Sequence, residues 1–243
     1  MGISDNNNPW RPASHGKPRQ LTNNLWMVDA ALPHMDIKRR MTIVQLPDHK
    51  LLLYSVICLD DAGMTWLESL GEPSIIVVPN GYHRTDAPRY KARFPKAQIW
   101  APTGSAKRIR DIVPIDRMLD TIAVNIPGGV SMRALQGTRN TEAFLTVHSD
   151  HDTTHVFCDA IFNVGKNDGH GLFWLIYMRW LGNAGKPRVT TLFRMSCIGN
   201  KRDFARGLRE AAVVPGLKRI IMAHGEVIEH DARQVLEHLA DTI

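Results

Sequence analysis

A short apolar run at residues 75–78 (IIVV), followed at once by a Pro-Asn-Gly turn, constrains the fold of this chain more than any other segment. Four consecutive β-branched residues are the pattern of a strand that is buried on both faces. Proline cannot donate to a ladder, and asparagine and glycine tolerate turn dihedrals, so the strand must end at Pro79. The pattern predicts an α/β architecture and places His83 and Asp86 just past the end of a central strand.

The composition is that of an ordinary folded protein. The 243 residues are 44% hydrophobic and 22% charged, which is enough apolar material to bury a substantial core. We expect a single domain over residues 23–243, because no internal repeat or change of composition divides them. Residues 1–22 are predicted to form a partly disordered polar arm, and they lack the apolar core of a signal peptide.

Charge and cysteine usage narrow the choice of partners and compartment. The net charge of +6 comes from scattered residues, and no aromatic residues are interleaved with the basic groups as a single-strand platform would require. Nucleic-acid binding is therefore not expected.

Cys58, Cys158 and Cys197 form an odd, widely spaced set. They argue against a disulfide framework and a cysteine-based zinc site, and they favour a reducing, cytoplasmic setting.

Strands and helices are expected along the whole domain. The predicted strands share β-branched or aromatic runs bounded by turn residues, and they span residues 25–29, 41–46, 51–59, 75–78, 98–101, 121–126, 130–135, 143–148, 154–159 and 218–223. The predicted helices have capping residues or an apolar face, and they span residues 63–70, 87–93, 105–112, 202–213 and 229–242.

Two further strands end on a residue that can bind a metal. Asp159 follows one apolar run (VFC), and His224 follows another (IIMA). A buried carboxylate needs a partner or a metal, since leaving it unpaired costs roughly several kcal/mol. Each residue also has a structural explanation: Asp159 could bond backbone amides or an arginine, and His224 could be hydrogen-bonded at a strand end. The corresponding alternative for His83 and Asp86 is an exposed loop histidine and an aspartate that caps a helix.

The order of these features resembles the metallo-β-lactamase-fold superfamily. The chain has a strand that ends in a His/Asp loop, a β-rich middle, a strand that ends in Asp159, and a strand that ends in His224 and Gly225 before a last helix. The likeness extends from about Leu25 to the C-terminus and is strongest to an uncharacterised branch, in which a Pro-Asn-x-x-His turn replaces the usual His-x-His-x-Asp-His loop. It implies an α/β (α+β) fold, a four-layer αββα sandwich of two mixed β-sheets flanked by helices.

The resemblance also implies a metal site and a function. His83 corresponds to a histidine of the first metal loop, Asp86 to a ligand at its end, Asp159 to the aspartate that bridges two metals, and His224 to the last histidine ligand. Asp86 and Asp159 are the expected catalytic carboxylates. The implied function is a hydrolase-like protein that uses a metal-bound water on a small-molecule substrate. Zinc is the first choice of metal, with iron and manganese as alternatives.

The first loop keeps only part of the superfamily's ligand set. His83 and Asp86 remain of a possible four ligands, and Gln136 and Gly137 stand where a further histidine is expected. A single metal ion is therefore predicted, because a catalytic zinc needs only three protein ligands and an open position.

Two alternatives stay open at this site. Glu142 and His148 lie close enough in sequence to substitute for the missing ligand, although exposed positions on a hairpin are expected for both. The site could instead be degenerate and hold no metal, with Arg84 or another cation neutralising Asp159. The protein would then be a non-catalytic relative that acts in ligand or protein binding.

The most apolar segment, residues 171–182 (GLFWLIYMRWLG), lies in a covering element expected near residues 166–189. It is too short to span a bilayer and carries Arg179, so no transmembrane segment is predicted. An aromatic stripe at helical spacing is more often core than docking surface, and its members are Phe173, Trp174, Tyr177 and Trp180. The segment would also suit an exposed helix that touches a membrane or binds a partner, including a second copy in a homo-oligomer.

Overall fold

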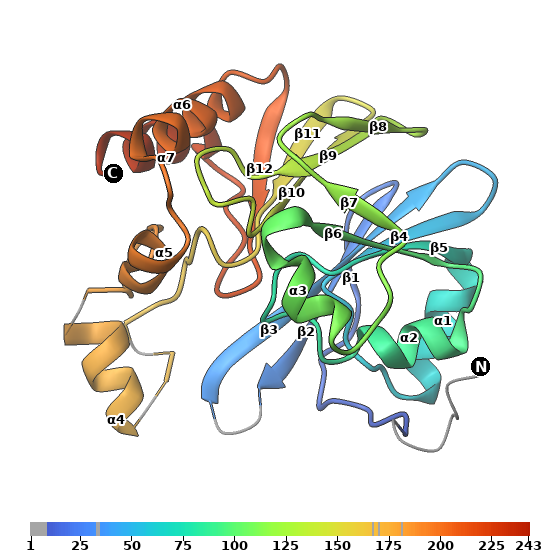
Figure 1. The fold of residues 1–243 in the computed structure, drawn as a ribbon. Coiled ribbons are helices and arrows are strands. Elements are labelled where there is room, and N and C mark those ends of the chain that lie inside the picture. The colour runs from blue at the N-terminus through green and yellow to red at the C-terminus, as the bar shows by residue number, and fades with distance from the viewer. Residues whose placement is uncertain (1–8, 33–34, 167, 170, 181) are drawn as a thin grey trace.

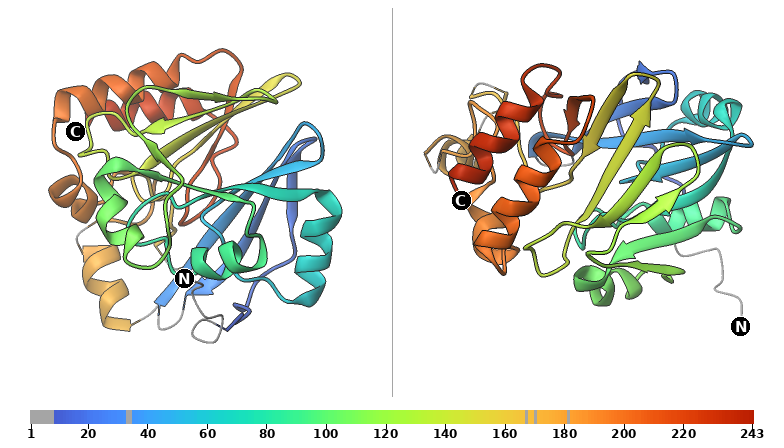
Figure 2. Two further views of the ribbon diagram at one scale, coloured as in Figure 1. Left: turned by 45° about the vertical axis from the view of Figure 1, so that its right-hand side comes forward. Right: turned by 90° about the horizontal axis from the view of Figure 1, so that it is seen from above.

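The computed structural model of the chain describes residues 9–32, 35–166, 168, 169, 171–180 and 182–243. Two β-sheets pack face to face, and helices cover the outer face of each sheet (Figure 1). Viewed from above, the late helices lie on one side of the strands and the early helices on the other (Figure 2). The predicted fold class, an αββα sandwich of two mixed sheets, is confirmed.

The larger sheet comes from the first half of the chain. Its strands lie side by side in sequence order, namely β1 (Arg19–Thr22), β2 (Leu25–Leu32), β3 (Met35–Leu46), β4 (Lys50–Tyr54), β5 (Glu72–Val77), β6 (Gln98–Pro102) and β7 (Arg117–Leu119). Pairing is antiparallel from β1 to β4 and parallel from β4 to β7. Ile76 and Val77 on β5 are fully buried, as the β-branched run predicts.

The smaller sheet comes from the second half of the chain. Its strands are β8 (Val124–Ile126), β9 (Val130–Ala134), β10 (Ala143–Ser149), β11 (Asp152–Val156) and β12 (Leu217–Ile221), in the order β12-β11-β10-β9-β8. β11 and β12 are parallel, whereas the other neighbours are antiparallel. Because parallel strands end at the same edge of a sheet, the segments that carry Asp159 and His224 emerge side by side.

Helices complete the outer layers. The larger sheet is covered by α1 (Asp61–Leu70), α2 (Ala87–Arg93), the 3₁₀ turn η2 (Thr103–Ser105) and α3 (Ala106–Arg110); the smaller sheet is covered by α6 (Lys201–Ala212) and α7 (Ala232–Asp241). Between the sheets, Leu52 and Val77 from the larger sheet meet Leu145 and Ile221 from the smaller one. Burying such side chains stabilises the sandwich by roughly 1.5–3 kcal/mol each.

Several predictions of local structure need correction. The strand predicted at residues 51–59 ends at Tyr54. β1 lies within the segment predicted as a polar arm and pairs with β2, while residues 1–8 of that segment lie outside the described part of the chain. The strand predicted at residues 154–159 ends at Val156, because the backbone N–H groups that follow turn towards a buried carboxylate, described below.

The covering element predicted near residues 166–189 contains α4 (Gly171–Phe173) and the π-helical turn η3 (Trp174–Trp180), and α5 (Thr191–Ser196) follows it. Trp174 is buried with 3% exposure, whereas Trp180 is 81% exposed; the side chains of Phe173 and Tyr177 lie outside the described part of the structure. Among the described helices, none is long and apolar enough to cross a membrane.

Candidate metal centre

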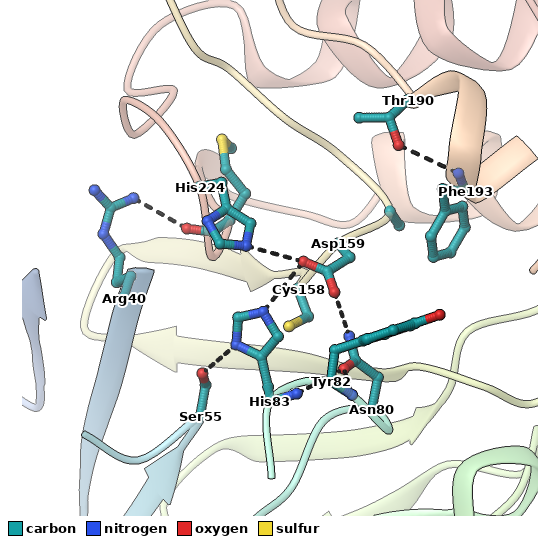
Figure 3. Close-up of polar contacts among 12 residues, drawn as sticks. Arg40, Ser55, Asn80, Tyr82, His83, Cys158, Asp159, Thr190, Phe193 and His224 are labelled. Carbon is teal, nitrogen blue, oxygen red and sulfur yellow. Dashed lines mark hydrogen bonds and ion pairs between the residues drawn. The ribbon is translucent and has the colours of Figure 1, made fainter. Parts of the chain in front are cut away.

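Three predicted site residues, His83, Asp159 and His224, lie together at one edge of the sandwich (Figure 3). His83 follows β5 of the larger sheet, and Asp159 and His224 follow the parallel strands β11 and β12 of the smaller sheet. The sheets therefore bring residues far apart in sequence into one group.

The contacts converge on one oxygen atom. Oδ1 of Asp159 lies 3.2 Å from Nε2 of His83 and 3.2 Å from Nε2 of His224. Despite these short distances, this buried oxygen has no hydrogen-bond partner among the described residues. Burial acts to raise the pKa of the Asp159 carboxyl, but the electrostatic effect of the two adjacent imidazoles, His83 first, outweighs it and holds that pKa well below its usual range. Asp159 is therefore a carboxylate that needs a cation.

The hydrogen bond made by Nδ1 of His224 determines whether its Nε2 carries a hydrogen or a lone pair. Nδ1 lies 2.7 Å from the carbonyl oxygen of Lys38, which can only accept, so Nδ1 carries a hydrogen and donates it. In neutral His224, Nε2 then has a lone pair directed at another electron-rich atom, Oδ1 of Asp159. Such a contact is repulsive unless a metal ion or a proton lies between the two atoms. Nδ1 of His83 bonds Ser55 Oγ at 2.8 Å, which fits either tautomer.

The separations fit a tetrahedral divalent ion. Two ligand atoms bound to zinc at about 2.0–2.1 Å are about 3.3 Å apart in tetrahedral geometry, close to the observed nitrogen–oxygen separations of 3.2 Å. Histidines that bind metals also commonly donate their other N–H to a backbone carbonyl, as His224 does to Lys38. The donor set is therefore suited to a zinc-type ion.

Cys158 is a fourth candidate ligand that the sequence argument set aside. The ligand atoms of His83, Cys158 and Asp159 all lie within 4.8 Å of one another. Burial raises the pKa of the Cys158 thiol well above its ordinary value, so without a metal it is protonated. Alternation along a strand would direct Cys158 and Asp159 to opposite faces, but β11 ends before them. The only signal in the sequence is their adjacency.

Glu142 supports the segment that carries Asp159. Its Oε1 accepts hydrogen bonds from the backbone N–H groups of Cys158 (2.9 Å) and Ala160 (3.2 Å), and its Oε2 accepts one from Asp159 (2.8 Å). Burial, and then the nearby charge of Asp159, raise the pKa of Glu142 to about 8, although the three N–H groups favour the ionised form. The prediction that Glu142 is exposed is wrong, since its exposure is 0%.

Several other predicted residues lie outside this group. His148 is exposed on β10, as expected, and its Nδ1 bonds Thr153 Oγ1 at 2.9 Å. Arg84 donates to the carbonyl oxygen of Arg108, so it does not neutralise Asp159. Among the described residues, the basic side chains that contact the carboxylate of Asp159 are the two histidines.

The carboxylate of Asp86 is held by two arginines. Oδ1 accepts from Arg89 Nη1 at 2.8 Å, and Oδ2 is paired with Arg39. Asp86 occupies the N-cap position of α2, but its side chain makes no capping hydrogen bond, so the alternative explanation of Asp86 as a side-chain cap is wrong. A metal at Asp86 would have to displace both guanidinium groups, and the structure does not bring this carboxylate together with His83, Asp159 and Cys158.

The site lines a cavity of about 470 Å³. Its lining includes the apolar side chains of Phe162, Leu192 and Phe193, together with Tyr82, over whose ring Arg108 lies at 4.4 Å from the centroid. A cavity of this size with a few polar groups in apolar walls is typical of small-molecule sites.

Comparison of sequences finds no counterpart: no protein-family model matches, and no curated protein matches. Solved structures do match. DIM-1 metallo-β-lactamase has a TM-score of 0.63 at 11% identity, over 93% of this chain and 97% of that chain. A metallo-β-lactamase from Hirschia baltica has a TM-score of 0.60 at 10% identity, over 95% and 98%. The mono-zinc form of FIM-1 from Pseudomonas aeruginosa has a TM-score of 0.60 at 12% identity, over 97% and 98%.

The molecule is thus an αββα sandwich with a histidine–aspartate group where its two sheets meet at one edge. The structural matches define this architecture further: the chain has the metallo-β-lactamase fold. At 9–13% identity the matches describe the fold and leave the substrate open.

Proposed function

We propose that this chain is a metal-dependent hydrolase-like protein that binds one divalent ion through His83, Asp159 and His224. The observation that carries the proposal is Oδ1 of Asp159, which is buried, lies 3.2 Å from two histidine nitrogens, and has no hydrogen-bond partner among the described residues. A cation among the three atoms accounts for all of these features. Zinc is the first choice, because a nearby thiol such as Cys158 favours zinc over manganese.

An ion held by these ligands lowers the pKa of a bound water towards neutrality and so supplies a nucleophile for hydrolysis. The chain's own residues provide the binding site for a small-molecule substrate. Phe162, Phe193 and Tyr82 present apolar surface to it, and Arg108 presents positive charge. Asp159 is the catalytic carboxylate in this proposal, whereas Asp86 supports the cavity wall through its ion pair with Arg39.

Metal binding tests the proposal directly. Elemental analysis of protein purified without chelator should find one metal ion per chain, and calorimetric titration of stripped protein should show one zinc site. His83→Ala and His224→Ala should abolish that site. His148→Ala is the matched control, because His148 is an exposed histidine outside the group, and it should bind zinc as the wild type does. A wild-type protein that contains no metal and refuses zinc, manganese and iron would contradict the proposal.

A second candidate function is ligand binding by a metal-free relative. The first loop favours this function, because His83 is the one histidine where the superfamily's loop has several. In such a protein a proton shared by His83 and Asp159 would take the place of the metal. Chelator-treated protein would then keep its unfolding temperature, and added zinc would not raise it. In the metal-binding case zinc stabilises the fold in proportion to its affinity.

A further inference from the structure

The helix of the covering element is apolar on two opposite faces. On one side, Trp174 and Met178 pack against Ile37, Val164 and Ala184 in a small core of their own. On the other side, large apolar side chains are exposed to solvent: Leu172 by 70%, Leu175 by 55%, Ile176 by 45% and Trp180 by 81%. A helix that is hydrophobic all round is normally covered by protein or by membrane. Here one face is left uncovered.

Exposed apolar side chains are concentrated in this part of the molecule. Of the eleven exposed large hydrophobic residues found in the described chain, six lie between residues 172 and 195. Two of the six, Leu192 and Met195, are on α5, the neighbouring helix at the same corner of the fold (Figure 1). We call the four exposed residues of the first helix, Leu172, Leu175, Ile176 and Trp180, the Trp180 surface.

The segment around the Trp180 surface is basic. Residues 169–202 contain no aspartate or glutamate, and they contain six basic residues, namely Arg179, Lys186, Arg188, Arg194, Lys201 and Arg202. Lys166 and Lys186 are exposed, and Lys166 is fixed beside the helix because Trp174 Nε1 donates to its carbonyl oxygen at 3.0 Å. The neighbouring carboxylate of Asp168 accepts a hydrogen bond from the backbone N–H of Gly165.

The charge distribution distinguishes between two partners that could cover the Trp180 surface, a second copy of the chain and an anionic membrane. In a symmetric dimer each subunit presents the same patch to the other, so the exposed Lys166 and Lys186 of one copy would lie close to those of its partner. Anionic lipid headgroups would instead neutralise these cations, and a tryptophan flanked by large aliphatic side chains is suited to the boundary between headgroups and acyl chains. We propose that the Trp180 surface is a docking surface for an anionic lipid membrane.

Vesicle flotation tests this proposal with the full chain. Wild-type protein should float with vesicles that contain phosphatidylglycerol, float little with phosphatidylcholine alone, and detach as salt is raised. Trp180→Asp removes the exposed tryptophan, and Lys186→Glu reverses a surface charge; each should lower the partition coefficient about tenfold or more. Ile122→Asp is the matched control, since Ile122 is 82% exposed but lies elsewhere, and it should bind as the wild type does.

Three results would overturn the proposal: no flotation with phosphatidylglycerol vesicles at low salt, equal flotation of wild type and Trp180→Asp, or a wild-type dimer in sedimentation that Trp180→Asp converts to a monomer. The last result would identify a second copy of the chain as the covering. Circular dichroism and the unfolding temperature establish that each variant is folded, and Leu175→Asp replaces Trp180→Asp if that variant does not fold.

Discussion

The side-chain amide of Asn80 donates a hydrogen bond of 2.8 Å to Oδ2 of Asp159, which leaves Oδ1 as the oxygen that faces both histidines. Asn80 Oδ1 accepts from the backbone N–H groups of Tyr82 (2.8 Å) and His83 (3.0 Å). One side chain therefore closes the turn that carries His83 and sets the rotation of Asp159.

Replacing Asn80 should weaken zinc binding without removing a ligand. Asn80→Asp keeps an acceptor for the turn but loses the N–H that orients Asp159, and it places a second carboxylate beside the first. We expect zinc affinity to fall by about 10–100-fold, the usual effect of losing a residue that orients a metal ligand. Calorimetric titration of the stripped protein measures this fall. Asn125→Ala, an exposed asparagine on β8, is the control, and equal affinities of Asn80→Asp and wild type would contradict the role.

Local patterns predicted much of this fold, because the β-branched run of β5 and the turn at Pro79 depend on neighbouring residues only. Asp159 and His224 were identified in the same way, as polar residues that directly follow buried runs. Asn80 was interpreted only as a turn residue. Its bond to Asp159 joins residues 79 positions apart, and the pattern of neighbouring residues along the chain gives no information about such a contact.

The burial of Glu142 could not be predicted from the sequence. A glutamate before an apolar strand is ordinarily an exposed residue, yet here it is fully buried and accepts hydrogen bonds from three successive N–H groups. Those groups are free to turn towards it because β11 stops at Val156. The buried carboxylate and the early end of the strand therefore explain one another, and neither can be predicted without the other.

Glu142→Gln should destabilise the fold, because an amide NH₂ group replaces one of two oxygens that both accept backbone hydrogen bonds. At least one buried N–H then loses its acceptor, and we expect the free energy of unfolding to fall by about 1–3 kcal/mol. Urea denaturation near pH 9, above the pKa of about 8 at which Glu142 ionises, measures the change. Glu210→Gln removes an exposed carboxylate from α6 and should change stability by less than about 0.5 kcal/mol; similar losses in both variants would argue against a special role for Glu142.

Ser55 combines a strained backbone with a contact to the site. Its φ is 59°, in the left-handed region, and its Oγ bonds Nδ1 of His83 at 2.8 Å. Ser55→Ala and Ser55→Gly remove the same hydroxyl, so both should weaken zinc binding equally, by up to about tenfold. Only glycine relieves the strain, so Ser55→Gly should be about 1 kcal/mol more stable than Ser55→Ala. Equal stabilities in urea would show that the conformation carries no strain.

His155 is a buried histidine that lies apart from the candidate metal centre and is held in its neutral form. Its Nε2 donates to the carbonyl oxygen of Ala211 at 3.0 Å, which leaves Nδ1 to accept from Thr146 Oγ1 at 3.0 Å. The pKa of His155 is lowered from 6.5 to about 4. Burial is the largest cause, the bond to the Ala211 carbonyl opposes it, and His148 and Arg133 add smaller lowering effects.

This depressed pKa makes stability depend on pH with a definite sign. Between about pH 6.5 and pH 4 the unfolded chain binds a proton at His155 that the folded chain does not, so stability is lost as the pH falls through this window, by up to about 3 kcal/mol in total. His155→Gln removes that contribution, and urea denaturation across the window should give a shallower pH dependence than for the wild type. The difference between the curves isolates His155, because other groups titrate in both proteins. His151→Gln, at an exposed position, should follow the wild-type curve; parallel curves for His155→Gln and wild type would mean that His155 titrates normally in the folded protein.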